Sequence, residues 1–293
     1  MKLGVAGIGK MGAAIATRLI EVGHDGAVWN RTPEKAGAVE GAKIAANPAE
    51  LAENSEAVIT ILTDAAALNA VYNGRLGLLH GKVAKKLIID MSTVLPAAEI
   101  ALADAVRAKD AAFVECPVGG STGPARQGKL IGLMGAEPAD AARARPILEQ
   151  LCRRLEHAGP VGSGSVLKFT INLPLMVYWQ ALGEALAMAR AVAIEPERLM
   201  DLLSDTSGAA NVLKVRAPGI ASMLKGDSAG AVTFDIDSAI KDMQSMLAEA
   251  KSQGIDLPLV ERTLGCYQET KRHRSGDAEI STVSVYWAGR DRQ

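Results

Sequence analysis

A lysine and an asparagine one helical turn apart are the residues of this chain whose types and spacing could do chemistry. Lys168 and Asn172 follow two glycines, Gly162 and Gly164, and enter a segment that stays apolar to about Ala193. Helical spacing places both polar ends on one face. Burial lowers the pKa of a lysine, which makes it a usable proton donor near neutral pH. The alternative is that Lys168 extends to the surface and Asn172 fills a structural position.

A glycine-rich motif at the start of the chain favours a role with a nucleotide. A short apolar strand is expected at Lys2–Ala6, and a helix with one apolar face follows from Met11. In this setting Gly7 permits a tight turn, Gly9 lets a pyrophosphate approach, and Gly12 allows close packing of helix and strand. The alternative is a structural turn. We expect the cofactor loop to comprise Gly7, Ile8, Gly9, Lys10, Met11 and Gly12.

The end of the next expected strand, Gly26–Trp29, indicates which dinucleotide binds. An NAD enzyme usually places an Asp or Glu here to accept from the ribose 2′-OH. This chain has no carboxylate at that position, and Arg31 could pair with a 2′-phosphate. The alternative is that Arg31 is a solvated residue before a helix at Pro33. The sequence therefore predicts NADP(H), held by Asn30, Arg31 and Thr32.

Three more apolar runs, Ala57–Leu62, Leu87–Ile89 and Ala112–Glu115, are typical of parallel strands covered on both faces. Open sheets of this kind bind ligands beyond the carboxyl ends of their strands. Ser92 and Thr93 could instead cap the following helix. We expect Leu62, Thr63 and Thr93 to contact the cofactor and Ser92 to contact the substrate.

A glycine-rich segment, Cys116–Pro124, follows the last of these runs. Such a loop can expose several backbone N–H groups, which suits a carboxylate or another anion. The alternative is a surface hairpin. We expect substrate contacts from Val118, Gly119, Gly120, Ser121 and Thr122, in addition to Lys168 and Asn172.

The order of the expected elements defines the fold class. Strands and helices alternate to about Gly159, which describes an α/β, doubly wound sheet of Rossmann type. After Gly164 helical patterns dominate, and no strong strand-like run returns before the last dozen residues. We therefore expect an NADP-binding domain at 1–161 and an all-α substrate and dimerisation domain at 162–293, joined by a long helix.

Composition excludes several functions. The chain has 293 residues with a net charge of −1 and 3% aromatics, so neither nucleic acid nor a membrane surface is an expected partner. The apolar run Phe169–Ala189 is interrupted by polar residues, which favours a buried helix over a membrane span. The three cysteines show no metal spacing and indicate reduced thiols. With no room for a signal peptide before the glycine motif, a cytoplasmic protein without a metal is expected.

With these residues in view, the chain resembles the β-hydroxyacid dehydrogenase family, which includes 3-hydroxyisobutyrate, tartronate-semialdehyde and glyoxylate/succinic-semialdehyde reductases. The resemblance covers nearly the whole chain. It rests on ordered motifs: G-x-G-x-M-G at 7–12, D-x-S-T-x-x-P at 90–96, a P-V-S-G-G-like loop at 117–121 followed by Ala125, Gly128 and Leu130, G-x-G-x-x-x-K-x-x-x-N at 162–172, Lys241-Asp242, and Ser275-Gly276-Asp277.

The resemblance implies a function and roles for the residues. A small β-hydroxyacid and its semialdehyde or keto form would be interconverted, with hydride transferred to or from the nicotinamide. Lys168 would be the general acid/base, Asn172 would orient the substrate or the lysine, and Lys241 would lie by the nicotinamide. The family also forms dimers or tetramers through its helical domains, so a homodimer or homotetramer is expected.

Two departures from the family pattern affect these expectations. Gly119 stands where the family has serine, and Ser121 where it has its last glycine, which leaves the identity of the acid group open. Pro174 within the expected long helix predicts a kink. Three alternatives remain: an imine reductase, which usually lacks a lysine at the Lys168 position; a 6-phosphogluconate-type decarboxylase, whose lysine is followed by His-Asn; and a non-catalytic NADPH-binding protein.

Overall fold

The computed structural model describes residues 1–290 and forms two compact units, Met1–Phe169 and a second that begins at Thr170. The boundary lies within helix α8 (Ser163–Ala189), later than the 161/162 division expected from sequence. The first turn of α8 packs within the first unit, because Gly162 and Gly164 donate backbone hydrogen bonds to a side chain of its sheet. The division of roles at 161/162 stays a prediction.

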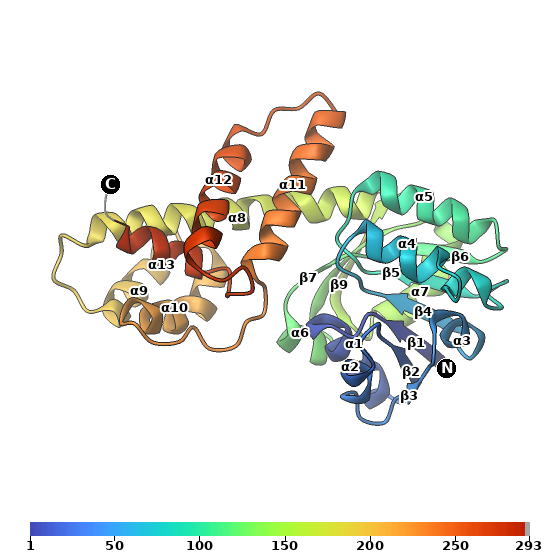
Figure 1. The fold of residues 1–293 in the computed structure, drawn as a ribbon. Coiled ribbons are helices and arrows are strands. Elements are labelled where there is room, and N and C mark those ends of the chain that lie inside the picture. Colours follow the sequence, from blue (N-terminus) through green and yellow to red (C-terminus); the bar gives the residue numbers. More distant parts are fainter. Residues whose placement is uncertain (291–293) are drawn as a thin grey trace. The chain divides into compact units, whose positions relative to one another are not determined.

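The first unit is built on one sheet with strand order β3-β2-β1-β4-β5-β6-β8-β7, and β9 pairs with β8 (Figure 1). Neighbours from β3 to β6 are parallel, whereas β8 is antiparallel to β6 and β7. The order 3-2-1-4-5-6 confirms the doubly wound sheet, whose dinucleotide site lies where the strand order reverses. The strands are β1 (Lys2–Ala6), β2 (Asp25–Trp29), β3 (Lys43–Ile44), β4 (Ala57–Thr60), β5 (Leu87–Asp90), β6 (Ala112–Glu115), β7 (Val118–Gly119), β8 (Leu130–Gly135) and β9 (Cys152–Gly159).

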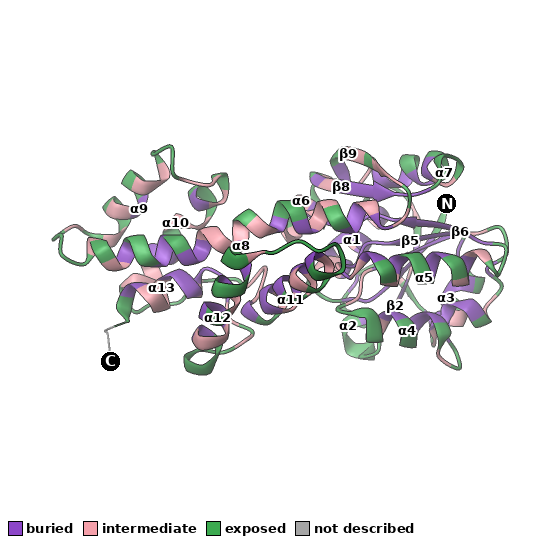
Figure 2. Cartoon of the chain, turned by 90° about the horizontal axis from the view of Figure 1, so that it is seen from above, coloured by how far each residue is buried: buried purple, intermediate pink, exposed green. Residues whose placement is uncertain are grey.

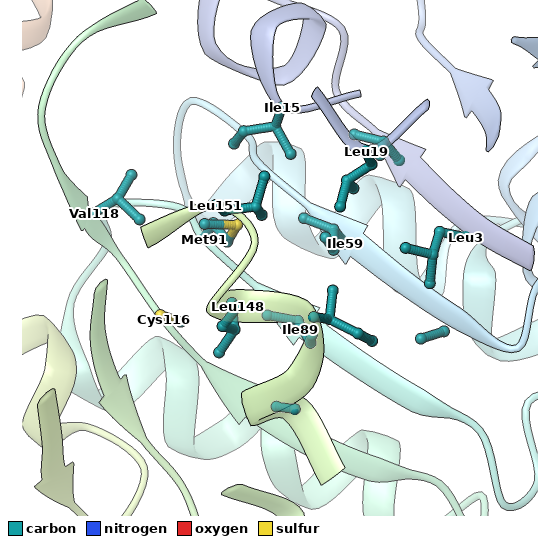
Figure 3. Close-up of a cluster of buried hydrophobic side chains, with 14 of the residues drawn as sticks. Leu3, Ile15, Leu19, Ile59, Ile89, Met91, Cys116, Val118, Leu148 and Leu151 are labelled. Carbon is teal, nitrogen blue, oxygen red and sulfur yellow. The ribbon is translucent and has the colours of Figure 1, made fainter. Parts of the chain in front are cut away.

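Helices cover both faces of this sheet, because alternate residues of each strand point to opposite sides. One core packs strand residues against α1 and α7 (Figure 3), and includes Leu3, Ile59, Ile89, Ile15 and Leu148. The other packs against α3, α4 and α5, and includes Val58, Ile88, Phe113, Leu51, Leu68 and Leu102. The helices are α1 (Lys10–Glu21), α2 (Pro33–Gly37), α3 (Pro48–Glu53), α4 (Ala65–Asn73), η1 (Leu78–His80), α5 (Pro96–Arg107), α6 (Thr122–Arg126) and α7 (Pro138–Leu148).

The second unit is helical as far as it is described, which agrees with the expected all-α domain. Trp179 on α8 and Tyr267 on α12 are almost fully buried. The Tyr267 hydroxyl donates to the Met176 carbonyl at 3.0 Å, and the Ser284 hydroxyl donates to the Trp179 carbonyl at 2.5 Å. These bonds join α12 and α13 to α8. The helices are α9 (Pro196–Ser204), α10 (Asn211–Leu224), α11 (Ile236–Ser252), α12 (Pro258–His273) and α13 (Thr282–Gly289).

Several elements were not expected from sequence, and β9, α10 and α13 show why. The strand β9 is half-exposed and charged, and it is ordered by pairing with β8. Helix α10 contains Pro218, which weakens its pattern. The run at 282–287 is rich in β-branched and aromatic residues, yet it forms α13 because Val283 and Ser284 are buried. Figure 2 shows the strands largely buried and the helices buried along one side. Of the helices in residues 1–290, none is long and apolar enough to cross a membrane.

Candidate active site

In the first glycine motif, two of the three glycines are required by the backbone packing and the third is not. Gly7 has a φ of +97°, and a Cβ there would overlap the Ile61 carbonyl oxygen. A Cβ at Gly12 would overlap the Gly7 carbonyl oxygen. These positions therefore need glycine for the turn and for the packing of α1. A Cβ at Gly9 would meet nothing within 4 Å, so this position keeps open space that a ligand could fill.

The N-terminus of α1 suits an anion. Gly9 is its N-cap, no side chain caps the helix, and no acidic residue lies in its first turn. The first amides of a helix lack partners within it and carry partial positive charge. Because the turn also has space at Gly9, the residues present fit a dinucleotide pyrophosphate.

At the end of β2, Asn30 makes structural hydrogen bonds that the sequence did not predict, and its contact with a cofactor stays a prediction. Asn30 Oδ1 accepts a hydrogen bond from the Ile8 backbone N–H at 2.9 Å, and Asn30 Nδ2 donates to the Thr32 carbonyl at 3.0 Å. Asn30 therefore holds the glycine turn to the next loop. Arg31 and Thr32 are exposed beside it, where they could meet a ligand's phosphate.

The ends of β4 and β5 are tied together. The Ser92 hydroxyl accepts from the Leu62 N–H at 2.9 Å, and the Ser92 N–H donates to Asp90 Oδ1 at 2.8 Å. Ser92 is 1% exposed, and these two bonds connect the loops after β4 and β5. Its hydroxyl does not cap α5, because the N-cap of that helix is Leu95. Thr63 is exposed and Thr93 is half-buried. The ligand contacts expected for these four residues stay predictions.

A buried carboxyl pair lies beneath these loops and was missed at the sequence level. Asp90 also accepts from the Thr60 hydroxyl. Burial raises the pKa of Asp90 and, together with the charges of Asp90 and Glu115, raises the pKa of Glu99 well above its usual range. Neither Glu99 oxygen meets a donor among the described residues. A protonated Glu99 can itself donate to Asp90, which makes the pair stable without a cation.

The glycine-rich segment after β6 is more ordered than a surface hairpin. Val118 and Gly119 form β7 and pair with Gly132 and Ile131 of β8. Gly120 has a φ of +123°, which a side chain rarely adopts. Ser121 is the N-cap of α6, but its hydroxyl makes no capping bond, and Thr122 begins that helix. Part of the backbone of this loop is thus paired with β8, whereas the Ser121 hydroxyl makes no hydrogen bond to the helix that follows it.

The lysine and asparagine lie on α8, four residues apart. Lys168 is half-buried and Asn172 is 7% exposed. Asn172 Nδ2 donates to Asp242 Oδ2 at 3.1 Å, and Lys241 Nζ forms an ion pair with Asp242 Oδ1 at 2.9 Å. Asp242, 3% exposed, thus connects two predicted site residues. Its role was missed, although its position beside Lys241 in a family motif could have indicated it.

No group of three or more His, Cys, Asp or Glu residues that could hold a metal occurs within 1–290. The doubly wound sheet and the open turn at Gly9 together define the class of dinucleotide-binding folds. Comparison with known proteins agrees with this class. Residues 2–159 match the model for the NAD binding domain of 6-phosphogluconate dehydrogenase, and residues 162–287 match that for NAD-binding of NADP-dependent 3-hydroxyisobutyrate dehydrogenase.

Individual relatives cover almost the whole chain. The 3-hydroxyisobutyrate dehydrogenase of Pseudomonas aeruginosa is 31% identical over 97% of this chain and 98% of its own length. Glyoxylate/succinic semialdehyde reductase 1 of Arabidopsis thaliana is 29% identical over 97% of each chain. The crystal structure of 3-hydroxyisobutyrate dehydrogenase from Salmonella typhimurium, 23% identical, matches the fold with a TM-score of 0.87 over 98% of this chain and 99% of that one.

The chain therefore belongs to the β-hydroxyacid dehydrogenase family. Its relatives indicate NAD(P)-dependent hydroxyacid dehydrogenase or reductase activity. This confirms the family and the fold expected from the ordered motifs.

Proposed function

We propose that the chain is an NADP(H)-dependent oxidoreductase that interconverts a small β-hydroxyacid and its semialdehyde or keto form, with Lys168 as the general acid/base. The observation that carries this proposal is the placement of Lys168 and Asn172 one turn apart on α8, with Asn172 bonded to Asp242. This bond fixes a buried amide one helical turn beyond Lys168, which supports a site that uses both side chains.

The protein's own residues divide the work. A bound nicotinamide dinucleotide supplies the redox chemistry. In reduction, Lys168 as an ammonium gives its proton to the oxygen of the former carbonyl group; in oxidation, Lys168 as a neutral amine removes the hydroxyl proton. Asn172 is fixed by Asp242 and orients the substrate or the lysine. Lys241 is paired with the same carboxylate, so the Lys241-Asp242 motif and Asn172 form one polar cluster of the second unit.

The cofactor would be held at the carboxyl ends of β1, β2, β4 and β5. The amides around Gly9 would bind its pyrophosphate, and the exposed Arg31 and Thr32 would bind the 2′-phosphate that distinguishes NADP(H). The substrate's acid group would be held by Gly120, by the Ser121 hydroxyl and by neighbouring residues of the 118–122 loop. Ser121 can compensate for the hydroxyl missing at Gly119, because its own hydroxyl makes no capping bond.

We also propose that the chain forms a homodimer or homotetramer. The second unit exposes several large apolar side chains, among them Met188 at 82%, Val215 at 76% and Val192 at 60%. Contact with another copy would remove this apolar surface from water. Sedimentation velocity tests the proposal, and a monomer at micromolar concentration would contradict it.

A substrate panel with both cofactors tests the function. NADPH and NADH oxidation would be followed with semialdehydes and small keto acids, and reduction of NADP⁺ and NAD⁺ with the matching hydroxyacids. We expect turnover of a short aldehyde that carries an acid group, with NADPH preferred. Turnover of cyclic imines alone would support an imine reductase instead. Tight NADPH binding without any turnover would support a binding protein.

A further inference from the structure

The second glycine motif, Gly162-Ser163-Gly164, receives a carboxylate of the chain itself. Glu115 is the last residue of β6 and is fully buried. Its Oε1 accepts hydrogen bonds from the backbone N–H groups of Gly162 at 2.7 Å and Gly164 at 2.6 Å. Its Oε2 accepts from the Ser165 hydroxyl at 2.9 Å. One side chain thus satisfies three donors at the beginning of α8.

The glycines around Glu115 leave room for this carboxylate. A Cβ at Gly135, the residue paired with Glu115 across β6 and β8, would overlap Glu115 Oε1. A Cβ at Gly164 would overlap the Leu133 carbonyl oxygen and come within 3.0 Å of Oε1. Gly162 has a φ of +101°. The G-x-G pattern before α8 is therefore explained by an internal anion.

The charge of this carboxylate is tuned by its surroundings. Burial raises the pKa of Glu115 to about 7, while the donors of Ser165, Gly164 and Gly162 act in the opposite direction. The charge of Glu115 in turn helps to raise the pKa of Glu99 on α5, so Glu99 is the protonated carboxyl of this cluster. The partial positive charge at the N-terminus of α8 favours the ionised form. Above neutral pH Glu115 is therefore ionised and able to accept from all three donors.

The position of Glu115 links two parts of the proposed site. In one direction the chain continues through Cys116 and Pro117 into the 118–122 loop. In the other, the bonds of Glu115 hold the first turn of α8, and Lys168 lies one turn beyond Ser165. Both parts belong to the first unit.

We propose that Glu115 is a positioning residue for the reaction: its carboxylate anchors the first turn of α8 to the end of β6 and so sets Lys168 relative to the loop that holds the substrate. This inference rests on the proposed function. A displacement of reacting groups by about 1 Å can lower a rate on the order of 10²-fold, so a loosened anchor should affect kcat more than binding.

The test compares Glu115→Gln with Glu99→Gln at pH 8. Glutamine keeps the size of Glu115 but presents an amide N–H₂ to one of the donors. Glu99 is an equally buried carboxyl of the same cluster, but its oxygens accept no hydrogen bond from α8 or any other described residue. We expect Glu115→Gln to lower kcat about 10²-fold with NADPH affinity kept, Glu115→Asp to restore part of it, and Glu99→Gln to stay within about threefold of the parent.

A second readout does not depend on turnover. Mass spectrometry would follow the rate at which acetic anhydride labels the Lys168 amine. We expect this rate to change in Glu115→Gln and to match the parent in Glu99→Gln. If Glu115→Gln does not fold, Ser165→Ala removes a single donor and should show a smaller change of the same kind.

The outcomes separate the two proposals. Parent-like kcat and parent-like labelling of Lys168 in folded Glu115→Gln would overturn the positioning role. Equal losses in Glu115→Gln and Glu99→Gln would also overturn it, since they would point to the cluster's charge or stability. If the parent reduces no aldehyde, the proposed function fails, and the labelling comparison still decides whether Glu115 sets Lys168.

Discussion

Two glycine pairs in this chain, Gly7 with Gly9 and Gly162 with Gly164, each start with a positive-φ glycine near the beginning of a helix, but their surroundings are opposite. Gly7 and Gly162 have φ values of +97° and +101°. The first turn has open space at Gly9 and no acidic residue in the first turn of α1. The second is filled by Glu115. A G-x-G pattern before a helix thus specifies a turn that presents amides to an anion, and whether a ligand or the chain supplies that anion depends on the neighbouring strand.

The largest effect is expected on the helix that follows the filled turn. Lys168→Ala should lower kcat by about 10²–10⁴, the range for a general acid/base, with NADPH affinity nearly unchanged. Lys168→Arg should restore little, because a guanidinium stays protonated. Steady-state kinetics with the best aldehyde and NADPH titrations measure both quantities. Near-normal turnover of Lys168→Ala would mean that another group donates the proton.

The filled turn should make folding stability depend on pH. The pKa of Glu115 is raised by burial from 4.5 to about 7, so the folded protein holds this proton more tightly than the unfolded chain. The stability that protonated Glu115 gives the fold is fully present below pH about 4.5 and is lost as the pH rises to about 7. The unfolding free energy should therefore fall by about 3 kcal/mol over this range. Denaturant unfolding at several pH values measures this. Glu115→Gln should flatten that part of the curve, and an unchanged slope would contradict the assignment.

Near the open turn, Arg31 is expected to bind the 2′-phosphate that distinguishes NADPH from NADH. Arg31→Ala should weaken NADPH binding by about 1.5–3 kcal/mol, the scale of a hydrogen bond to a charged group, with little change for NADH. Fluorescence titration with both cofactors gives the two affinities. An equal loss for both would show that Arg31 does not read the phosphate.

A matched pair of alanine substitutions contrasts the two turns directly. Gly164→Ala places a Cβ against the Leu133 carbonyl and should destabilise the fold by about 1–3 kcal/mol. Gly9→Ala meets only open space, so Tm should stay near the parent's while cofactor affinity falls. Thermal unfolding and cofactor titration of both variants are the measurements. If Gly9→Ala bound the cofactor as tightly as the parent, the assignment of the pyrophosphate to this turn would be wrong.

The smallest effect concerns the substrate loop. Ser121→Ala should weaken substrate binding by about 0.5–1.5 kcal/mol, the net value of one hydrogen bond, without altering NADPH binding. The ratio of KM values for variant and parent measures it. A substrate-bound crystal structure with the acid group far from the 118–122 loop would contradict the assignment.

Local patterns predicted much of the fold and indicated which residues to consider for the site. The strand, turn and helix around Gly7 and Gly12 follow from periodicity and from backbone sterics, which act over a few residues. The order of strand-like runs was enough to predict the doubly wound sheet. The spacing of four residues was enough to place Lys168 and Asn172 on the same face of one helix. The end of the chain was less predictable, because packing against α8 decided the conformation of α13.

The rest of the site depends on contacts between distant positions. Glu115 could be read as an acidic residue in an apolar strand, but its partners lie 47 and 49 positions further on. Asn172 and Asp242 are 70 positions apart. The hydrogen bond from the Ile8 N–H to Asn30 spans 22 positions. No local spacing encodes such pairs, so only the folded chain brings them together.

The fit around Glu115 has a consequence for how related sequences can diverge. A Cβ at Gly135 would overlap Glu115 Oε1, whereas one at Gly164 would overlap the Leu133 carbonyl oxygen, so it is position 135 that favours glycine while a glutamate occupies position 115. A shorter acid at 115 would release some of that space. Positions 115 and 135 should therefore change together across evolution, although they lie in separate stretches of the gene, and a designer who transfers α8 to another sheet would have to transfer this pair with it.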